Sequence, residues 1–148
     1  MMMLISGCGG QKDTVILSEP VPYQSLPAHA EGIFMALEED IFYGTPEKMH
    51  VTLLNDSREV YHYGAYYQLE YKKDGMWHIV PYRENIFAKY PDFKNTGKLL
   101  EPNEGIEQNY LPEDLDLKLA PGNYRLVKTF IHSSDDYTVS VAVPFTIR

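Results

Sequence analysis

The stretch Thr138-Val139-Ser140-Val141-Ala142-Val143-Pro144-Phe145-Thr146-Ile147-Arg148 decides the fold class. Apolar side chains alternate along it with small or polar ones, which is the two-residue period of a half-buried β-strand. Pro144 has no backbone N–H, so we expect the strand to lie at a sheet edge or to carry a bulge there. Such a strand fits an antiparallel sheet that buries one face.

Shorter segments with the same period precede this strand. Met49, Val51 and Leu53 alternate with His50, Thr52 and Leu54, and the segment ends at Asn55-Asp56-Ser57, a typical turn sequence. Further strands are expected at residues 33–37, 104–110 and 124–132. None of these segments continues at helical spacing for the roughly 10 residues that an argument for a helix needs. The pattern therefore favours strands.

A hairpin is predicted in the middle of the chain. Residues 66–72 carry Tyr and Leu on one face and more polar side chains on the other, and residues 76–80 form a second apolar run. Asp74-Gly75 lies between them, and glycine readily adopts the positive φ that a tight hairpin turn requires. The two runs are therefore expected to pair as antiparallel strands.

Six or seven short strands and almost no helix predict an all-β fold, an antiparallel β-sandwich. Residues 82–102 have the weakest pattern: 83–87 is either a short strand or a helical turn, and the remainder is expected to cross between the sheets in a Greek key. The length of 148 residues fits one domain and is enough to bury roughly two thirds of the unfolded surface.

Charge and cysteine content exclude several classes of protein. Thirteen Lys and Arg against 21 Asp and Glu give a net charge of −8, which repels a phosphate backbone, so we expect no nucleic-acid partner. The single cysteine, Cys8, excludes an internal disulfide and a zinc site built from cysteines.

The stretch Leu119-Ala120-Pro121-Gly122-Asn123-Tyr124 has the form of a tyrosine corner. In that motif a Tyr at the start of a late strand turns its ring into the core, and its hydroxyl bonds to the backbone just upstream. Tyr124 is therefore predicted to be structural. Lys128 has the same inward parity, so we expect it to end near the rim of the sandwich or to pair with an acid.

A wider pattern resembles a family of bacterial immunoglobulin-like domains found in secreted proteins and lipoproteins. Its parts here are an early strand ending at Asn55, then Tyr63-Gly64, Leu69-Glu70, Asp74-Gly75-Met76-Trp77, Pro121-Gly122-Asn123-Tyr124-Arg125-Leu126 and Phe145-Thr146-Ile147. The resemblance covers about residues 32–148 and implies an immunoglobulin-like Greek-key sandwich of about seven strands without a disulfide. These motifs mark a fold, and the resemblance implies no active site.

The N-terminus resembles the lipobox of bacterial lipoproteins. Ile5-Ser6-Gly7-Cys8 has an aliphatic residue, two small residues and a cysteine whose thiol can be acylated. In lipoproteins the signal is cut before this cysteine, which becomes the lipidated N-terminus. The alternative is a free thiol in a floppy N-terminal segment.

This resemblance predicts three parts of the chain and a location. Residues 1–8 are the remnant of a signal peptide that ends in Cys8, residues 9–30 are a flexible linker rich in Gly, Pro and polar residues, and residues 31–148 are the domain. We expect the protein to be extracytoplasmic and held on the bacterial cell membrane by its lipid.

A search for catalytic or metal-binding motifs returns little. The five histidines lack His-x-x-x-His spacing. His50 and His132 lie on predicted strands that could belong to different sheets, so we interpret them as surface or rim residues rather than as a shared metal site. Asp135-Asp136 fits a solvated turn better than a calcium loop, and Glu38-Glu39-Asp40 fits a charged loop. Nucleophile elbows and phosphate-binding glycine loops are also missing. We therefore expect no catalytic residue, metal or cofactor, and a protein that is not an enzyme.

Aromatic residues supply the possible ligand contacts. Tyrosines cluster between residues 61 and 71, and Tyr offers a large amphipathic contact area. Strands also favour Tyr, so half of the cluster is expected to face the core. Tyr63 and Tyr66 are the expected exposed members, and Trp77 is expected to pack on the sandwich or to stack on a ligand.

Three functions remain open. The first is a non-enzymatic lipoprotein whose domain binds a protein or a cell-envelope component. The second is a protease inhibitor that presents residues 90–103, with Phe93-Lys94-Asn95 in the middle. The third is a carbohydrate-binding module that uses Tyr63, Tyr66 or Trp77 as stacking platforms.

Overall fold

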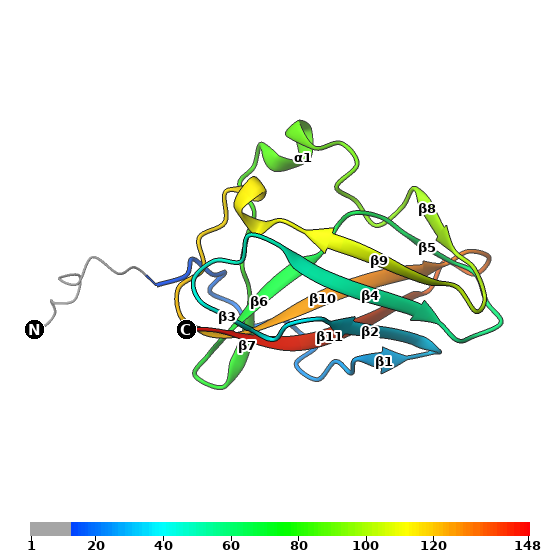
Figure 1. The fold of residues 1–148 in the computed structure, drawn as a ribbon, viewed down its shortest axis with the longest axis horizontal. Coiled ribbons are helices and arrows are strands. Elements are labelled where there is room, and N and C mark those ends of the chain that lie inside the picture. The colour runs from blue at the N-terminus through cyan, green and yellow to red at the C-terminus, as the bar shows by residue number, and fades with distance from the viewer. Residues whose placement is uncertain (1–12) are drawn as a thin grey trace, which may run out of the picture.

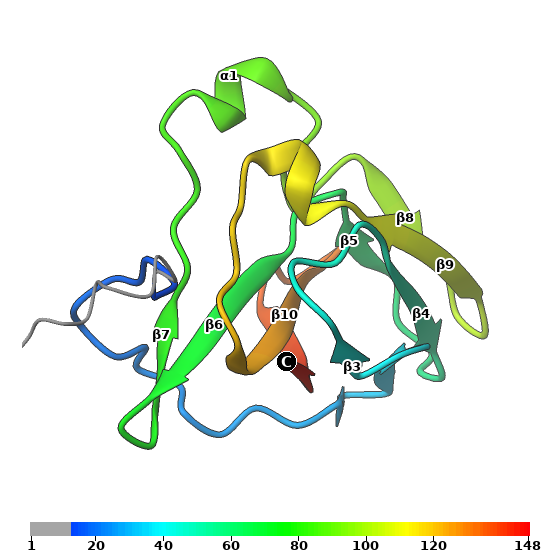
Figure 2. The same ribbon diagram turned by 60° about the vertical axis from the view of Figure 1, so that its left-hand side comes forward.

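Two β-sheets pack face to face in the computed structural model, which describes residues 13–148 (Figures 1 and 2). The first sheet has the order β1 (His29–Ala30), β2 (Ile33–Leu37), β4 (Met49–Asn55) and β9 (Gly105–Tyr110). The second has the order β3 (Ile41–Phe42), β11 (Thr138–Ile147), β10 (Gly122–His132), β5 (Tyr61–Tyr63) and β8 (Lys98–Leu100), with β6 (Gln68–Lys73) also on β10 and β7 (Met76–Ile79) on β6. The predicted all-β sandwich is confirmed.

The core lies between the sheets and is made by the inward positions of each strand. β4 alternates strictly, with Met49, Val51 and Leu53 fully buried. The second sheet contributes mainly aromatic and branched side chains: Tyr124, Leu126, Phe130, Val139, Val141, Phe145 and Ile147. Burial of these apolar groups is the main stabilising contribution to the fold.

Pro144 fits its strand because of the direction of the neighbouring N–H groups. The N–H groups of Ala142 and Thr146 point away from β10 and donate to the carbonyl oxygens of Pro27 and Asp40, at 2.9 and 2.8 Å. Pro144 lies between them with the same orientation, and β3 pairs only with the last two residues of β11. The missing N–H therefore removes no bond to β10, as expected for the outer side of a strand.

The predicted turn and corner both form. Asp74 and Gly75 have φ angles of 52° and 81° and connect β6 to β7, as a two-residue hairpin turn requires. The Tyr124 hydroxyl donates to the carbonyl oxygen of Ala120 at 2.5 Å, four residues upstream. The tyrosine corner is therefore confirmed.

The crossover region contains a short helix and a short strand. Helix α1 (Ile86–Lys89) projects from one end of the sandwich, above the 3₁₀ helix η2 (Pro112–Leu115), and β8 then pairs with β5 (Figure 1). The loop between them rests on Gly64: a Cβ there would lie 2.1 Å from the carbonyl oxygen of Lys94. Glycine at this position is therefore needed for the loop to pack.

The structure differs from the predicted flexible linker, residues 9–30, over the part from residue 13 onward. Residues 13–28, called here the N-terminal strap, run along β7 and cross the outer face of the second sheet. The N–H groups of Leu17 and Val21 donate to the carbonyl oxygens of Ile79 and Trp77, both at 2.9 Å. These bonds cover the free edge of β7, which composition alone could not indicate.

Candidate binding site

The N-terminal strap buries an ion pair on the outer face of the second sheet. Arg125 Nε donates to Glu70 Oε1 at 2.7 Å, and both side chains are at most 5% exposed. The two Nη atoms donate to the strap, to the carbonyl oxygens of Gln24 and Tyr23, at 2.8 and 2.7 Å. The guanidinium therefore joins the strap to the sheet.

A hollow of about 430 Å³ opens beside this ion pair. Its walls come from the strap and from the outer positions of β7, β10 and β11: Gln24, Ser25, Leu26, Pro27, Trp77, Arg125, Ala142 and Pro144. Trp77 is half-buried, and its ring centre lies 4.9 Å from the Arg125 guanidinium and 5.5 Å from Lys72 Nζ. Part of the indole is thus available in a hollow that also contains polar groups.

Gln24 fixes the backbone at this hollow. Its side-chain oxygen accepts from the N–H of Trp77 at 2.8 Å, and its amide donates to the carbonyl oxygens of Val21 and Trp77. Because both ends of the amide are used, the strap and β7 are locked in one register. A ligand in the hollow would meet a surface that is already formed.

The aromatic residues that were predicted to contact a ligand lie in different surroundings in the structure. Tyr63 is only 6% exposed and belongs to the core, which differs from the expected surface position. Tyr66 is half-buried, and its ring packs on Phe93 and Phe87 at 5.1 and 6.4 Å. Tyr66 and Trp77 are not brought together in one hollow. Cys8 lies outside the described residues.

Lys128 is buried in the core rather than at the rim, and no acid lies against it among the described residues. Its Nζ donates to the carbonyl oxygens of Gly64 and Tyr66 at 2.5 and 2.6 Å, between the rings of Tyr63 and Tyr110. Burial, with a smaller contribution from the charge of Lys98, lowers the pKa of Lys128 to about 7. The alternation along the strand predicted that the Lys128 side chain points inward, but it did not predict the two carbonyl oxygens that Lys128 bonds.

The histidines lie apart. His50 on the first sheet bonds Asn109 and Glu107, whose hydrogen bonds raise its pKa, while His132 on the second sheet bonds Glu59 at 2.7 Å. Within residues 13–148, no group of three or more His, Cys, Asp or Glu side chains could hold a metal.

The loop considered for protease inhibition is packed rather than projecting at its centre. Phe93 is 7% exposed and belongs to the core cluster, and the carbonyl oxygen of Lys94 accepts from the N–H of Tyr66 at 3.1 Å. Phe93 is therefore turned into the domain, while Lys94 next to it is exposed.

Glu70, Arg125 and Gln24 are the site residues that sequence reasoning missed. Glu70 and Arg125 occupy outward positions of their strands, where polar residues normally meet water. They face each other across the paired strands β6 and β10. Opposite charges on two strands that pair could have indicated this ion pair from the sequence. Their burial depends on the strap, whose position leaves no periodic pattern in the sequence.

The comparisons with known proteins agree with this architecture. The bacterial Ig-like domain family matches residues 29–145, and the chain belongs to this family. Domains of this family are generally non-catalytic. None of the curated proteins compared with the chain matches it.

Solved structures with a partial likeness are much longer proteins. A β-glucosidase from Erythrobacter marinus aligns over 79% of this chain and 15% of its own, with 15% identity and a TM-score of 0.39. A β-glucosidase from Listeria innocua aligns over 78% of this chain and 16% of its own, with 15% identity and a TM-score of 0.34. Likenesses as weak as these carry no information about activity.

Among the described residues, no helix is long and apolar enough to cross a membrane.

Proposed function

We propose that this protein is a non-enzymatic, extracytoplasmic lipoprotein whose Ig-like domain binds a protein or a cell-envelope component. Membership of the bacterial Ig-like family supports a binding or structural domain. The sequence Ile5-Ser6-Gly7-Cys8 supports attachment to the cell membrane through a lipid on Cys8. The observation that carries the binding role is the preformed hollow beside Trp77.

Attachment at Cys8 would hold one end of the domain near the membrane. Thr14 is 6% exposed; its hydroxyl accepts from the N–H of Ala120 at 2.8 Å and shares a hydrogen bond with the Tyr124 hydroxyl. Thr14 is the sixth residue after Cys8, and an extended chain of that length reaches at most about 20 Å. The tyrosine corner would therefore stay within about this distance of the lipid.

The anchor is tested on the protein in its own bacterium. Mass spectrometry of the membrane fraction is expected to show an N-terminal Cys8 with a diacylglyceryl group. Cys8→Ser should move the protein out of the membrane fraction. An unmodified Cys8, or a distribution that Cys8→Ser does not change, would contradict the lipoprotein proposal.

The binding role is tested by sedimentation of the purified chain with isolated cell envelopes. Trp77→Ala is expected to weaken co-sedimentation by about ten-fold, because truncation of an aromatic contact commonly loses 1 kcal/mol or more. Tyr43→Ala is the matched control, since Tyr43 is 81% exposed and does not line the hollow. Equal loss in both variants, or none in either, would argue against a site at Trp77.

A carbohydrate ligand is the second candidate, and the half-exposed indole in a hollow with polar groups favours it. Sugars stack on such rings and hydrogen-bond to nearby hydroxyls, and the exposed Ser25 supplies a hydroxyl here. A glycan array probed with the purified chain and with Trp77→Ala decides between the candidates. If the chain binds no glycan on the array but still binds cell envelopes, the ligand is a protein.

A further inference from the structure

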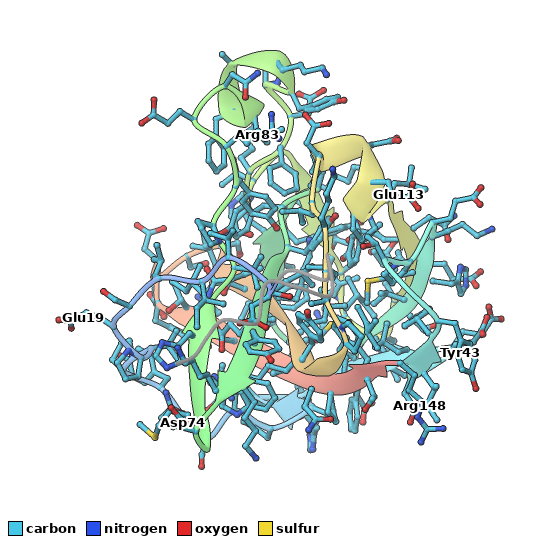
Figure 3. The ribbon with its side chains drawn as sticks, turned by 90° about the vertical axis from the view of Figure 1, so that its left-hand side faces the viewer. Glu19, Tyr43, Asp74, Arg83, Glu113 and Arg148 are labelled. Atoms are coloured by element: carbon cyan, nitrogen blue, oxygen red, sulfur yellow. The ribbon has the colours of Figure 1, made fainter. Side chains whose placement is uncertain are left out.

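A second hollow, of about 230 Å³, lies at the end of the sandwich formed by α1 and η2. Figure 3 shows this end with Arg83 and Glu113 labelled. Aromatic rings and two carboxylates dominate the lining, which includes Tyr67, Tyr90, Phe93, Tyr110, Asp92 and Asp114. This hollow is separate from the one beside Trp77, with which it shares no lining residue.

The aromatic walls are held by one another. The rings of Tyr67 and Tyr110 stack at 4.3 Å between centres, and Phe93 meets Tyr67 edge to face at 5.5 Å. The Tyr90 hydroxyl donates to the carbonyl oxygen of Asp114 at 3.2 Å, which ties the α1 side of the hollow to η2. The site therefore needs no large rearrangement to receive a ligand.

Negative charge and an unsatisfied polar group lie at the same place. Asp92 and Asp114 are exposed residues that line the hollow, and each carries a negative charge. Tyr67 is 3% exposed, and its hydroxyl has no hydrogen-bond partner within residues 13–148. Burial, and then the charge of Asp114, raise the pKa of Tyr67. Buried hydroxyls are normally paired, so this one points to a missing partner.

We propose that this hollow receives the cationic side chain of a lysine or arginine presented by a partner protein. An aromatic face attracts a cation, and Tyr90 is the half-buried ring of the lining, whereas Tyr67, Phe93 and Tyr110 are buried. The charges of Asp92 and Asp114 add Coulombic attraction. The volume suits one long side chain, and the net charge of −8 favours approach of a basic partner. The inference specifies a partner for the proposed binding role and is independent of Cys8.

Lys89 already shows how this wall attracts a cation. Its Nζ lies 5.4 Å from the centre of the Tyr90 ring, on the last turn of α1. An incoming ammonium group would be repelled by this charge and would compete with it for the ring. Lys128 Nζ lies 5.5 Å from the Tyr110 ring, but two carbonyl oxygens hold it in the core.

The test uses NMR titration of the full 148-residue chain with blocked single residues, N-acetyl-lysine methylamide and N-acetyl-arginine methylamide. A dissociation constant of about 1–10 mM is expected, given the size of these probes. The blocked norleucine analogue, which has the aliphatic stem without the charge, should bind at least ten-fold more weakly. Chemical shift changes should concentrate at residues 65–67, 90–93 and 109–115.

Surface variants separate the site from general electrostatics. The double variant Asp92→Asn, Asp114→Asn should weaken lysine binding about ten-fold, whereas Asp135→Asn on the distant β10–β11 turn should have no effect. Lys89→Gln should strengthen binding about two- to three-fold. All of these positions are exposed, so the variants are expected to fold.

Three results would overturn the inference: no shift changes up to 50 mM probe, equal binding of blocked norleucine, or unchanged binding in the double Asp variant. Because the probes are small and soluble, these results do not depend on a lipid anchor or on the hollow beside Trp77. Envelope binding that persists in the double Asp variant and is lost in Trp77→Ala would leave the proposed function intact and would assign envelope binding to the hollow beside Trp77.

Discussion

Two cations on the same strand are buried in opposite ways. Arg125 points out of the sandwich and is covered by the N-terminal strap, where it pairs with Glu70 and donates to two strap carbonyl oxygens. Lys128, three residues later, points into the core and is fully buried. Its hydrogen-bond acceptors within residues 13–148 are two carbonyl oxygens and no carboxylate. One charge is neutralised by an acid, and the other is not.

The difference follows from the chemistry of the two side chains. A guanidinium stays protonated under all ordinary conditions, so burial of Arg125 requires a fixed negative partner. An amine can lose its proton, and the neutral form of Lys128 still has two N–H groups for Gly64 and Tyr66. The pKa of about 7, lowered by burial and by Lys98, reflects this. The free energy of unfolding should therefore depend on the carboxylate of Glu70 at the Arg125 site and on pH at the Lys128 site.

The largest expected effect comes from removing the acid. Glu70→Gln keeps the shape of the side chain but leaves Arg125 charged and buried without its counter-charge. Loss of one partner from a buried pair typically destabilises by about 3–5 kcal/mol. Urea unfolding, followed by circular dichroism, should show a corresponding fall in the free energy of unfolding.

The double variant Glu70→Leu, Arg125→Met is the matched control, since it removes both charges. It should recover most of the stability lost in Glu70→Gln, with the strap carbonyl oxygens of Tyr23 and Gln24 left without their donor. If Glu70→Gln has the stability of the native protein, the ion pair is not what holds Arg125 under the strap.

The second effect is a pH dependence from Lys128. Between about pH 7 and pH 10 the amine is neutral in the folded protein but protonated in the unfolded chain, whose lysines have a pKa of about 10.4. The unfolded state then binds more protons, so stability rises with pH, by up to about 1.4 kcal/mol per pH unit. Above pH 10 the buried tyrosines reverse the trend, since burial raises the pKa of Tyr124 to about 12.

Urea midpoints measured between pH 6.5 and 9.5 test this dependence. Lys128→Met should flatten the rise, although the carbonyl oxygens of Gly64 and Tyr66 then lose a donor. Lys98→Gln, which removes only the neighbouring charge, should preserve the rise and shift its onset to slightly higher pH. An identical slope in Lys128→Met and the native protein would assign the dependence to other groups.

Much of the sandwich was predictable because its signals are local. Strict alternation in β4 and β11, the Asp74-Gly75 turn and the tyrosine corner each depend on residues close together in the chain. The family resemblance then joined these parts into one architecture. Helix α1 was less predictable, because 83–87 carried no clear period and the loop around it is fixed by contact with Gly64.

The candidate site was less predictable because it depends on contacts that are distant in sequence. Trp77 was identified by its residue type, but its hollow needs the strap some 50 residues earlier and Pro144 nearly 70 residues later. Tyr63 was expected at the surface because a tyrosine has no residue-level signal that separates an exposed ring from a core ring. Only the pairing of strands decides which face it takes.

A smaller effect concerns Tyr124, which shares the inward face of β10 with Lys128. Tyr124→Phe keeps the ring in the core and removes the hydroxyl that bonds Ala120 and Thr14. We expect a loss of about 1–3 kcal/mol, because a buried acceptor is left without its donor. Thermal and urea unfolding measure it, and Tyr137→Phe, at a ring 41% exposed, is the control.

The smallest effect tests whether the strap belongs to the domain as firmly as the core does. Thr14→Val keeps the branched shape and removes only the hydroxyl, so we expect a loss of about 1 kcal/mol. Because Thr14 and Tyr124 share a hydrogen bond, the double variant with Tyr124→Phe should lose about 0.5–1 kcal/mol less than the sum of the two single losses. Strict additivity in urea unfolding would mean that the strap opens independently of the sandwich. In that case the cover over Arg125 and Glu70 would be lost more easily than the core around Lys128.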